Sequence, residues 1–247
     1  MSVDLNADLG EGASTDGALL EVITSANIAC GGHAGDEISM RGAVAAAIAH
    51  GVGIGAHPSY PDREGFGRRA MSLSPRKLIE TLADQIRRLA MIAEHAGAAV
   101  AHVKAHGALY NVAVNSEDVA AAIGQAVCLV NPDLIAVALA GSKMASIFRD
   151  LGLRVAEEAF IDRGYTAAGA LVARSDSRAL ITDPAEAAAR AVRMMQQGVV
   201  ESVDGVAVRV RADTLCIHAD TPGSPKIAAV TRRGLEDAGF TVARMGA

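Results

Sequence analysis

The sequence predicts one α/β domain, 1–247, in which parallel strands and helices form a single (β/α) barrel of seven or eight strands. Two observations lead to this fold. Short apolar runs alternate with amphipathic helical stretches, without a linker rich in Ser, Pro or Gly, and this alternation is typical of a parallel sheet covered by helices. The length of 247 residues is close to the ~250 of a typical (β/α) barrel. An open, doubly wound sheet is the alternative.

The first half of the chain contains four apolar runs that we expect to be strands. They are 2–8, 26–30, 52–57 and 99–104. A helix is expected to follow the second run and to begin at Glu37. A longer helix is expected after the third run, because Ser74 is a good N-cap, Pro75 suits the first helical position and Gly97 suits the end.

The second half continues the alternation. Ser116 is expected to cap a helix that Pro132 follows. Further strands are expected at 133–139, at 153–160, within 206–219 as one or two strands, and at 240–245. The helices between them are expected to end near Gly152, to extend from about Pro184 to Gly198, and to cover 224–239.

The charge and cysteine content limits the classes of partner. The formal net charge is −5, with 23 basic and 28 acidic residues well mixed, so we expect no nucleic-acid partner. The sequence has no leading signal segment, and no run reaches the ~18 apolar residues of a membrane helix. The three cysteines are widely spaced, which favours reduced thiols. We therefore expect a cytoplasmic protein without a membrane partner.

Ionisable and polar side chains recur where the predicted strands end. Histidines stand at four such places, at His33, His57, His106 and His218. The carboxyl ends of the strands share one face of a β/α fold, and active sites lie there. A single histidine at a strand end is more often a hydrogen-bonded structural residue than a catalyst. The four together favour a shared site.

The first strand carries a polar stripe. Side chains two residues apart share one face of a strand, so Asp4, Asn6 and Asp8 are expected inside the barrel and the apolar residues between them against the helices. A buried carboxylate needs a partner, and Lys104, at the end of its own strand, is a natural one. Asp4 could instead anchor the bottom of the barrel.

Two other polar features have simpler explanations. Asp36 could cap the helix that follows it. Arg68 and Arg69 could be a solvated pair in a loop, of which only one matters for function.

The chain contains, in this order, the segments DLNADLGEG, NIACGGHAGD, GAHPSYPDREGFGRR, VKAHGALYN, EAFIDRGY and TLCIHADTP. In these segments it resembles the LamB/YcsF family, whose pattern reads DLNxDLGEG, NxACGxHAGD, GAHPxYPDxxGFGRR, VKPHGALYN, ExFADRxY and TLCxHGDTP. Ala105, Ile161 and Ala219 replace the Pro, Ala and Gly of that pattern. None of these replacements removes an ionisable side chain.

The resemblance implies a barrel of the glycoside hydrolase/deacetylase type. It also implies a part in the ATP-dependent hydrolysis of 5-oxo-L-proline to L-glutamate, with 5-oxoprolinase subunits B and C as partners. A lactam is an unactivated amide, and phosphorylation of its oxygen would make it a good electrophile for water delivered by a general base. The sequence has no G-x-x-x-x-G-K-[ST] loop, so an ATP site here is unconventional or lies on a partner.

The resemblance also implies roles for the polar residues at the strand ends. The expected catalytic residues are Asp8, His33, His57, Lys104, His106, Glu158 and Asp162. The expected substrate-binding residues are Asn6, Glu11, Tyr60, Arg68, Tyr110, Asn111, Arg163, His218 and Asp220.

Two alternative functions stay open. The first is a metal-dependent amide hydrolase or deacetylase that acts without ATP, with a divalent metal held among Asp8, His33, His57 and His218. The second is a non-catalytic subunit that binds 5-oxoproline for its partners. A polysaccharide substrate is disfavoured because the sequence has no Trp and few other aromatic residues for sugar rings to stack on.

Overall fold

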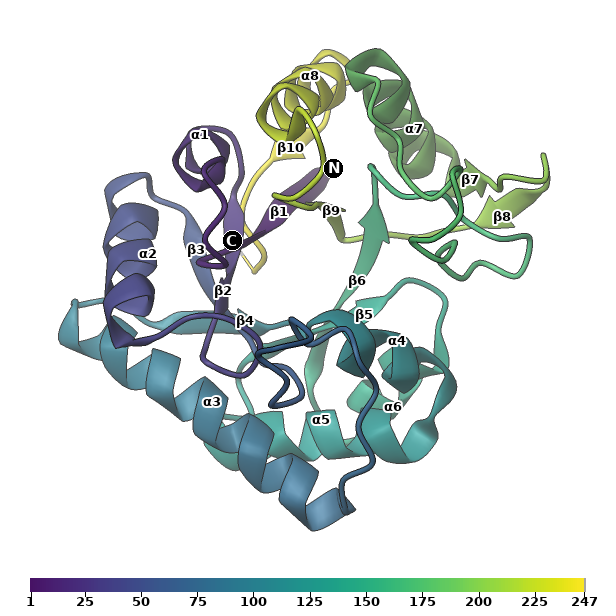
Figure 1. Ribbon diagram of the computed structural model, residues 1–247. Helices are drawn as coiled ribbons and strands as arrows, with labels where there is room; N and C mark the ends of the chain where they lie inside the picture. The colour runs from purple at the N-terminus through teal and green to yellow at the C-terminus, as the bar shows by residue number, and fades with distance from the viewer. Residues whose placement is uncertain (247) are drawn as a thin grey trace.

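Seven parallel strands close into a barrel that helices surround (Figure 1). The computed structural model describes residues 1–246. The barrel strands are β1 (Ser2–Leu9), β2 (Ser25–Ala29), β3 (Gly53–His57), β4 (Val100–Val103), β5 (Ile135–Leu139), β6 (Arg154–Phe160) and β9 (Thr214–Ile217). Each strand pairs with the next, and β9 pairs with β1 to close the ring. The predicted barrel is therefore confirmed over the open sheet.

The helices lie outside the strands. They are α1 (Asp16–Leu20), α2 (Glu37–Ala49), α3 (Pro75–His95), α4 (Gly107–Asn115), α5 (Glu117–Val130), α6 (Lys143–Asp150), α7 (Pro184–Gln197) and α8 (Ser224–Asp237). Three expected caps are confirmed: Ser74, Ser116 and Asp36 accept backbone N–H groups at the starts of α3, α5 and α2. Asp36 forms a reciprocal capping box with Ser39, which accounts for its place in the sequence.

The strands expected near the carboxyl end are present, but two of them differ from the prediction in place or length. The segment 206–219 forms two strands, of which β8 (Ala207–Arg209) pairs antiparallel with β7 (Val199–Glu201) outside the barrel. The strand β7 was not predicted, because it is only three residues long. The closing strand β10 (Thr241–Val242) is also shorter than expected and pairs with the amino end of β1.

The alternation in β1 divides the barrel wall into two faces. Its apolar side chains join the hydrophobic core between strands and helices, while Asp4, Asn6 and Asp8 are buried inside the barrel. Asp4 accepts hydrogen bonds from hydroxyls of Thr24, Ser25 and Thr214, at 2.5 to 2.7 Å. Asp4 therefore joins three strand starts, as an anchor at the barrel bottom would.

The short helices α1 and α4 follow barrel strands directly, in segments where no helix was expected. In α4 the extended backbone of His106 and the left-handed Gly107 (φ 56°) turn the chain sharply from β4 into the helix. This turn places His106 at the mouth of the barrel. None of the helices formed by residues 1–246 is both long and apolar enough to cross a membrane.

Candidate active site

A cavity of about 420 Å³ opens at the carboxyl ends of the barrel strands. Most of the side chains expected at the site line its wall. These are Asp8, Glu11, His57, Arg68, Lys104, His106, Tyr110, Asn111, Arg163, His218 and Asp220. They come from the ends of β1, β3, β4, β6 and β9, from the loops that follow and, for Tyr110 and Asn111, from α4. This is the shared face of the barrel that the strand order predicts.

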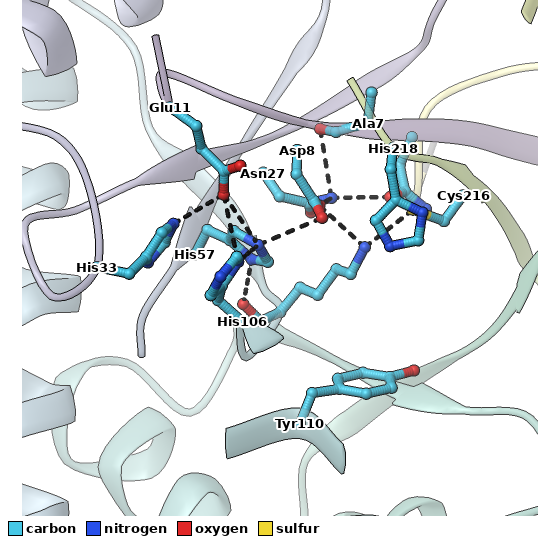
Figure 2. A network of polar contacts seen from close by, with 12 residues as sticks. Ala7, Asp8, Glu11, Asn27, His33, His57, His106, Tyr110, Cys216 and His218 are labelled. Atoms are coloured by element: carbon cyan, nitrogen blue, oxygen red, sulfur yellow. Dashed lines mark hydrogen bonds and ion pairs between the residues drawn. The ribbon is translucent and has the colours of Figure 1, made fainter. Parts of the chain in front are cut away.

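Three histidines converge on the carboxylate of Glu11 (Figure 2). Its Oε1 lies 2.7 Å from His33 Nε2, 3.2 Å from His106 Nδ1 and 3.8 Å from His57 Nε2. Burial alone would raise the pKa of Glu11, but the polar contacts with the rings of His106 and His33 lower the pKa below its usual value. Glu11 is therefore a carboxylate at neutral pH.

The three imidazoles differ in their protonation. Burial is the main cause that lowers the pKa of His33, to about 4, and it also lowers the pKa of His106. Burial acts in the same direction on His57, but the negative charge of Asp8 raises the pKa of His57 above its ordinary value. His57 is thus the most basic of these three rings and lies where it can exchange a proton with the cavity.

Backbone carbonyls fix the orientation of two of these rings. His57 Nδ1 lies 2.8 Å from the carbonyl oxygen of Lys104, and His106 Nε2 lies 3.0 Å from that of Phe66. Phe66 has a left-handed backbone conformation (φ 54°), which is strained for a residue with a side chain and is typical of functional sites.

A second cluster surrounds the ammonium group of Lys104. Its Nζ lies 2.9 Å from Asp8 Oδ1, 2.9 Å from Glu158 Oε1 and 3.0 Å from Cys216 Sγ. The expected pairing of Lys104 with Asp8 is confirmed. Burial disfavours charge on Lys104, but the negative charges of Asp8 and Glu158 raise its pKa well above the ordinary value. The same cluster lowers the pKa of Asp8 against the effect of burial, with His57 as the first cause and Lys104 as the second.

The mouth of the cavity has an exposed ion-pair bridge. Asp220 Oδ2 lies 2.6 Å from an Arg68 nitrogen and 3.0 Å from an Arg174 nitrogen. Arg68 faces this bridge and lines the cavity, whereas Arg69 pairs with Asp62. The two arginines at 68 and 69 thus have different roles, and only Arg68 belongs to the cavity wall.

Several expected site residues lie behind the wall. Asp162 is fully buried and accepts hydrogen bonds from His218 and Thr221. Asn6 donates to Glu158 Oε1 at 3.1 Å, and Glu158 also accepts from the hydroxyl of Tyr110 at 3.0 Å. Asn6, Asp162 and Glu158 therefore do not line the cavity themselves. Asp162 and Glu158 orient the side chains of His218 and Tyr110, which do line it.

Two expected substrate-binding residues have other contacts in the structure. Tyr60 packs within the hydrophobic core, and the described residues that line the cavity do not include it, so substrate binding by its side chain is not supported. The position of Tyr60 after β3 predicts that it lies near the mouth of the barrel, but it does not predict whether its ring points into the cavity or into the core. Arg163 lines the cavity, but its guanidinium donates to the backbone carbonyls of Ala179 and Val172. That group therefore holds the loop after β6.

The predicted set of metal ligands is divided between two groups. One group consists of Glu11, His33, His57 and His106, and the other of Asp8, Cys216 and His218. In each group the possible ligand atoms lie within 4.8 Å of one another. The expected set combined two residues from each group, because strand ends show that residues share a face but not which of them are neighbours on it.

Three further site residues were missed from the sequence. Asn27 donates to Asp8 Oδ1 at 2.9 Å, and its polar side chain within the apolar run 26–30 was a usable signal. Cys216 was not expected at the site, but its thiol contacts Lys104, and burial raises its pKa well above the ordinary value. Arg174 stands in an irregular stretch, where no strand or helix pattern indicates its position.

Comparison with known proteins gives near full-length matches. The pattern of the LamB/YcsF family matches residues 3–247. The chain is 48% identical over 246 residues to the A subunit of the 5-oxoprolinase of Bordetella pertussis, covering 98% of each chain. It is 45% identical over 247 residues to the protein of the same name from Heliobacterium modesticaldum, covering 98% of this chain and 97% of the other.

Solved structures support the fold at two levels of similarity. The crystal structure of a lactam utilization protein from Thermus thermophilus superimposes with a TM-score of 0.93 and 45% identity, covering 99% of this chain and 100% of the other. The catalytic domain of a peptidoglycan N-acetylglucosamine deacetylase from Eubacterium rectale aligns with a TM-score of 0.52 and 12% identity, covering 98% of this chain and 87% of the other. This second similarity concerns the fold alone.

Proposed function

The chain belongs to the LamB/YcsF family, and we propose that it is the A subunit of an ATP-dependent 5-oxoprolinase that hydrolyses 5-oxo-L-proline to L-glutamate with cleavage of ATP to ADP and phosphate. The observation that carries this proposal is the near full-length similarity, at 45 to 48% identity, to proteins named as the A subunit of 5-oxoprolinase. The proposed partners are subunits B and C. The proposed compartment is the cytoplasm, in keeping with three free cysteines.

The cavity offers the groups that opening of a lactam requires. The basic ring of His57 and the carboxylate of Glu11 can take a proton from water. The ammonium of Lys104 can stabilise the negative charge that develops on the lactam or phosphate oxygen. At the mouth, Arg68 and Arg174 can bind the substrate carboxylate or a phosphate. These groups suit a small anionic amide.

In our proposal, the other expected catalytic residues hold or orient the groups that line the cavity. Asp8 neutralises Lys104 and faces His57, with its Oδ2 3.4 Å from His57 Nε2. Glu158 holds Lys104 from the other side. Asp162 orients the ring of His218 through contacts of 3.1 Å. We propose that ATP binds on a partner or at an unconventional site, because the sequence lacks a phosphate-binding loop.

A glutamate-release assay tests the proposal. It uses 5-oxoproline and ATP with this chain alone, with subunits B and C alone, and with all three. We expect ATP-dependent glutamate release only when all three are present. Equal release by subunits B and C without this chain would refute the assignment, and ATP-driven release by this chain alone would refute the dependence on partners.

The cluster around Glu11 favours a second candidate, a metal-dependent amide hydrolase that acts without ATP. In the same assay this function predicts ring opening by the isolated chain that is independent of ATP and sensitive to a chelator.

A further inference from the structure

The facing nitrogens of His57 and His106 present an electrostatic conflict. A backbone carbonyl only accepts hydrogen bonds, so His57 Nδ1 and His106 Nε2, which contact carbonyl oxygens at 2.8 and 3.0 Å, carry the ring protons. A neutral imidazole has one N–H. With both rings neutral, the other two nitrogens, His57 Nε2 and His106 Nδ1, direct lone pairs at each other across 3.0 Å. A proton on His57 Nε2, which the raised pKa of His57 favours, is the alternative to a metal ion between them.

The carboxylate of Glu11 adds a third lone-pair atom to this conflict. Its Oε1 lies 3.2 Å from His106 Nδ1 and 3.8 Å from His57 Nε2. All three residues line the cavity, yet they are mostly buried, so bulk water screens them little. Three acceptor atoms that converge in this way need a positive charge between them.

His33 has a different position in the cluster. Its Nε2 donates to Glu11 Oε1 at 2.7 Å, while its buried Nδ1 has no hydrogen-bond partner among residues 1–246. The rings of His33 and His106 are stacked, with centroids 3.6 Å apart and planes inclined by 2°. A metal ion lies close to the plane of the imidazole that binds it, so one ion cannot lie in both of these parallel planes.

We propose that Glu11, His57 and His106 bind a divalent transition-metal ion through Oε1, Nε2 and Nδ1, and that His33 is a positioning residue for the Glu11 carboxylate. Two imidazoles and one carboxylate are the protein ligands of many catalytic zinc and iron sites, which leave a position open for water or substrate. Here that position faces the cavity.

The distances between the ligand atoms fit this proposal. Ligands bound at 2.0–2.1 Å in a tetrahedral site lie about 3.4 Å apart. The three separations here, 3.0, 3.2 and 3.8 Å, bracket that value. The carbonyls behind His57 and His106 and the His33 contact to Glu11 are the outer contacts that usually orient metal ligands. The proposed metal site does not require the lactam as substrate. With an ion bound, His57 and Glu11 are its ligands, and they are proton acceptors only in the metal-free site.

Metal titration of the isolated chain tests the site without substrate, ATP or partners. Metal-free protein is titrated with Zn²⁺ by calorimetry, and with Co²⁺, whose visible absorption reports nitrogen and oxygen ligands. We expect one ion per chain. His57→Gln and His106→Gln should abolish stoichiometric binding, and His33→Asn should weaken it about 10- to 100-fold, as loss of an outer contact does. His50→Gln, at the exposed end of α2, is the matched control and should bind as the parent does.

Two results would overturn the proposal. If the parent chain binds neither ion above the level of the His57→Gln/His106→Gln double variant, a shared proton and not a metal resolves the conflict. If His33→Asn abolishes binding while His106→Gln preserves it, the assignment of ligands is wrong. Circular dichroism shows whether each variant is folded. Even if a variant unfolds, the Co²⁺ spectrum of the parent chain shows whether the chain binds a metal ion. If the chain binds no metal ion, the proposed 5-oxoprolinase function is not thereby refuted, because the glutamate-release assay tests that function separately.

Discussion

The ammonium group of Lys104 lies 2.9 Å from the carboxylate of Glu158, and their side chains are only 3% and 0% exposed. A buried ion pair is stable only when further hydrogen bonds satisfy both partners. Glu158 receives them from Asn6 and Tyr110, and Lys104 has Asp8 as a second carboxylate. Lys104 is therefore part of the barrel interior as well as of the cavity wall.

Replacing Lys104 by Met should affect both stability and turnover. The change leaves two buried carboxylates without their cation, which should lower the free energy of unfolding by roughly 3–5 kcal/mol. If Lys104 also stabilises charge on the substrate, turnover of the complex should fall ~10²–10³-fold. Chemical denaturation and glutamate release measured on the same preparation separate the two effects.

The double variant Lys104→Met/Glu158→Gln is the control for this experiment. It removes one unpaired carboxylate, so part of the lost stability should return while turnover stays low. Near-normal turnover in the folded single variant would remove Lys104 from the catalytic residues.

The bridge of Arg68, Asp220 and Arg174 should matter for substrate binding more than for stability. Exposed ion pairs typically contribute about 0–1 kcal/mol, so Arg174→Ala should leave the melting temperature almost unchanged. Loss of a cation that binds the substrate carboxylate should raise KM about tenfold, which corresponds to about 1.4 kcal/mol, with little change in kcat. Arg76→Ala, which breaks an exposed pair with Glu80 on α3, is the control. An unchanged KM for Arg174→Ala would show that the bridge does not contact substrate.

Most of the barrel was predictable because its signals are local. The polar stripe of β1, the N-caps at Ser74 and Ser116 and the apolar runs each depend on a few adjacent residues. The hairpin of β7 and β8 was not predictable in full, because three-residue strands carry too little pattern to be distinguished from a loop.

The candidate site was predictable only as a set of residues at one end of the barrel. The division of the histidines into partners of Glu11 and partners of Asp162 depends on ring directions, which strand ends do not reveal. The same limit explains Tyr60, which packs into the core, and Arg174, which reaches the cavity from an irregular loop.

Gly67→Ala should disturb the histidine cluster. A Cβ at Gly67 would lie 2.8 Å from ring or Cβ atoms of both His106 and His33, and its backbone is left-handed (φ 64°). We therefore expect weakened metal binding together with a stability loss of roughly 1–2 kcal/mol from the backbone conformation. Gly205→Ala has the same backbone strain (φ 76°) with nothing within 4 Å, so it should lose stability and keep the metal site. Equal metal affinity in the two variants would contradict the packing argument.

His102 should make the fold sensitive to acid. Its ring is buried, and its Nε2 lies 2.9 Å from Asn27 Oδ1. Burial, and then the charges of Lys104 and His57, lower the pKa of His102 to about 3. The unfolded chain, with an ordinary histidine pKa of about 6.5, binds more protons than the folded chain between these two values. Stability is therefore lost as the pH falls below about 6.5, by up to about 1.4 kcal/mol for each pH unit.

His102→Gln tests this origin of the acid sensitivity, because glutamine keeps an N–H donor for Asn27 and does not titrate. Denaturant unfolding of the parent and the variant at pH 7 and pH 5 gives the two pH dependences. Burial lowers the pKa of His33 to about 4, so His33 also makes the free energy of unfolding depend on pH. This contribution is the same in the parent and in the variant, so it cancels when the two pH dependences are compared. The parent should lose about 2 kcal/mol more than the variant between these pH values. The same loss in both proteins would mean that other groups, and not His102, make the fold sensitive to acid.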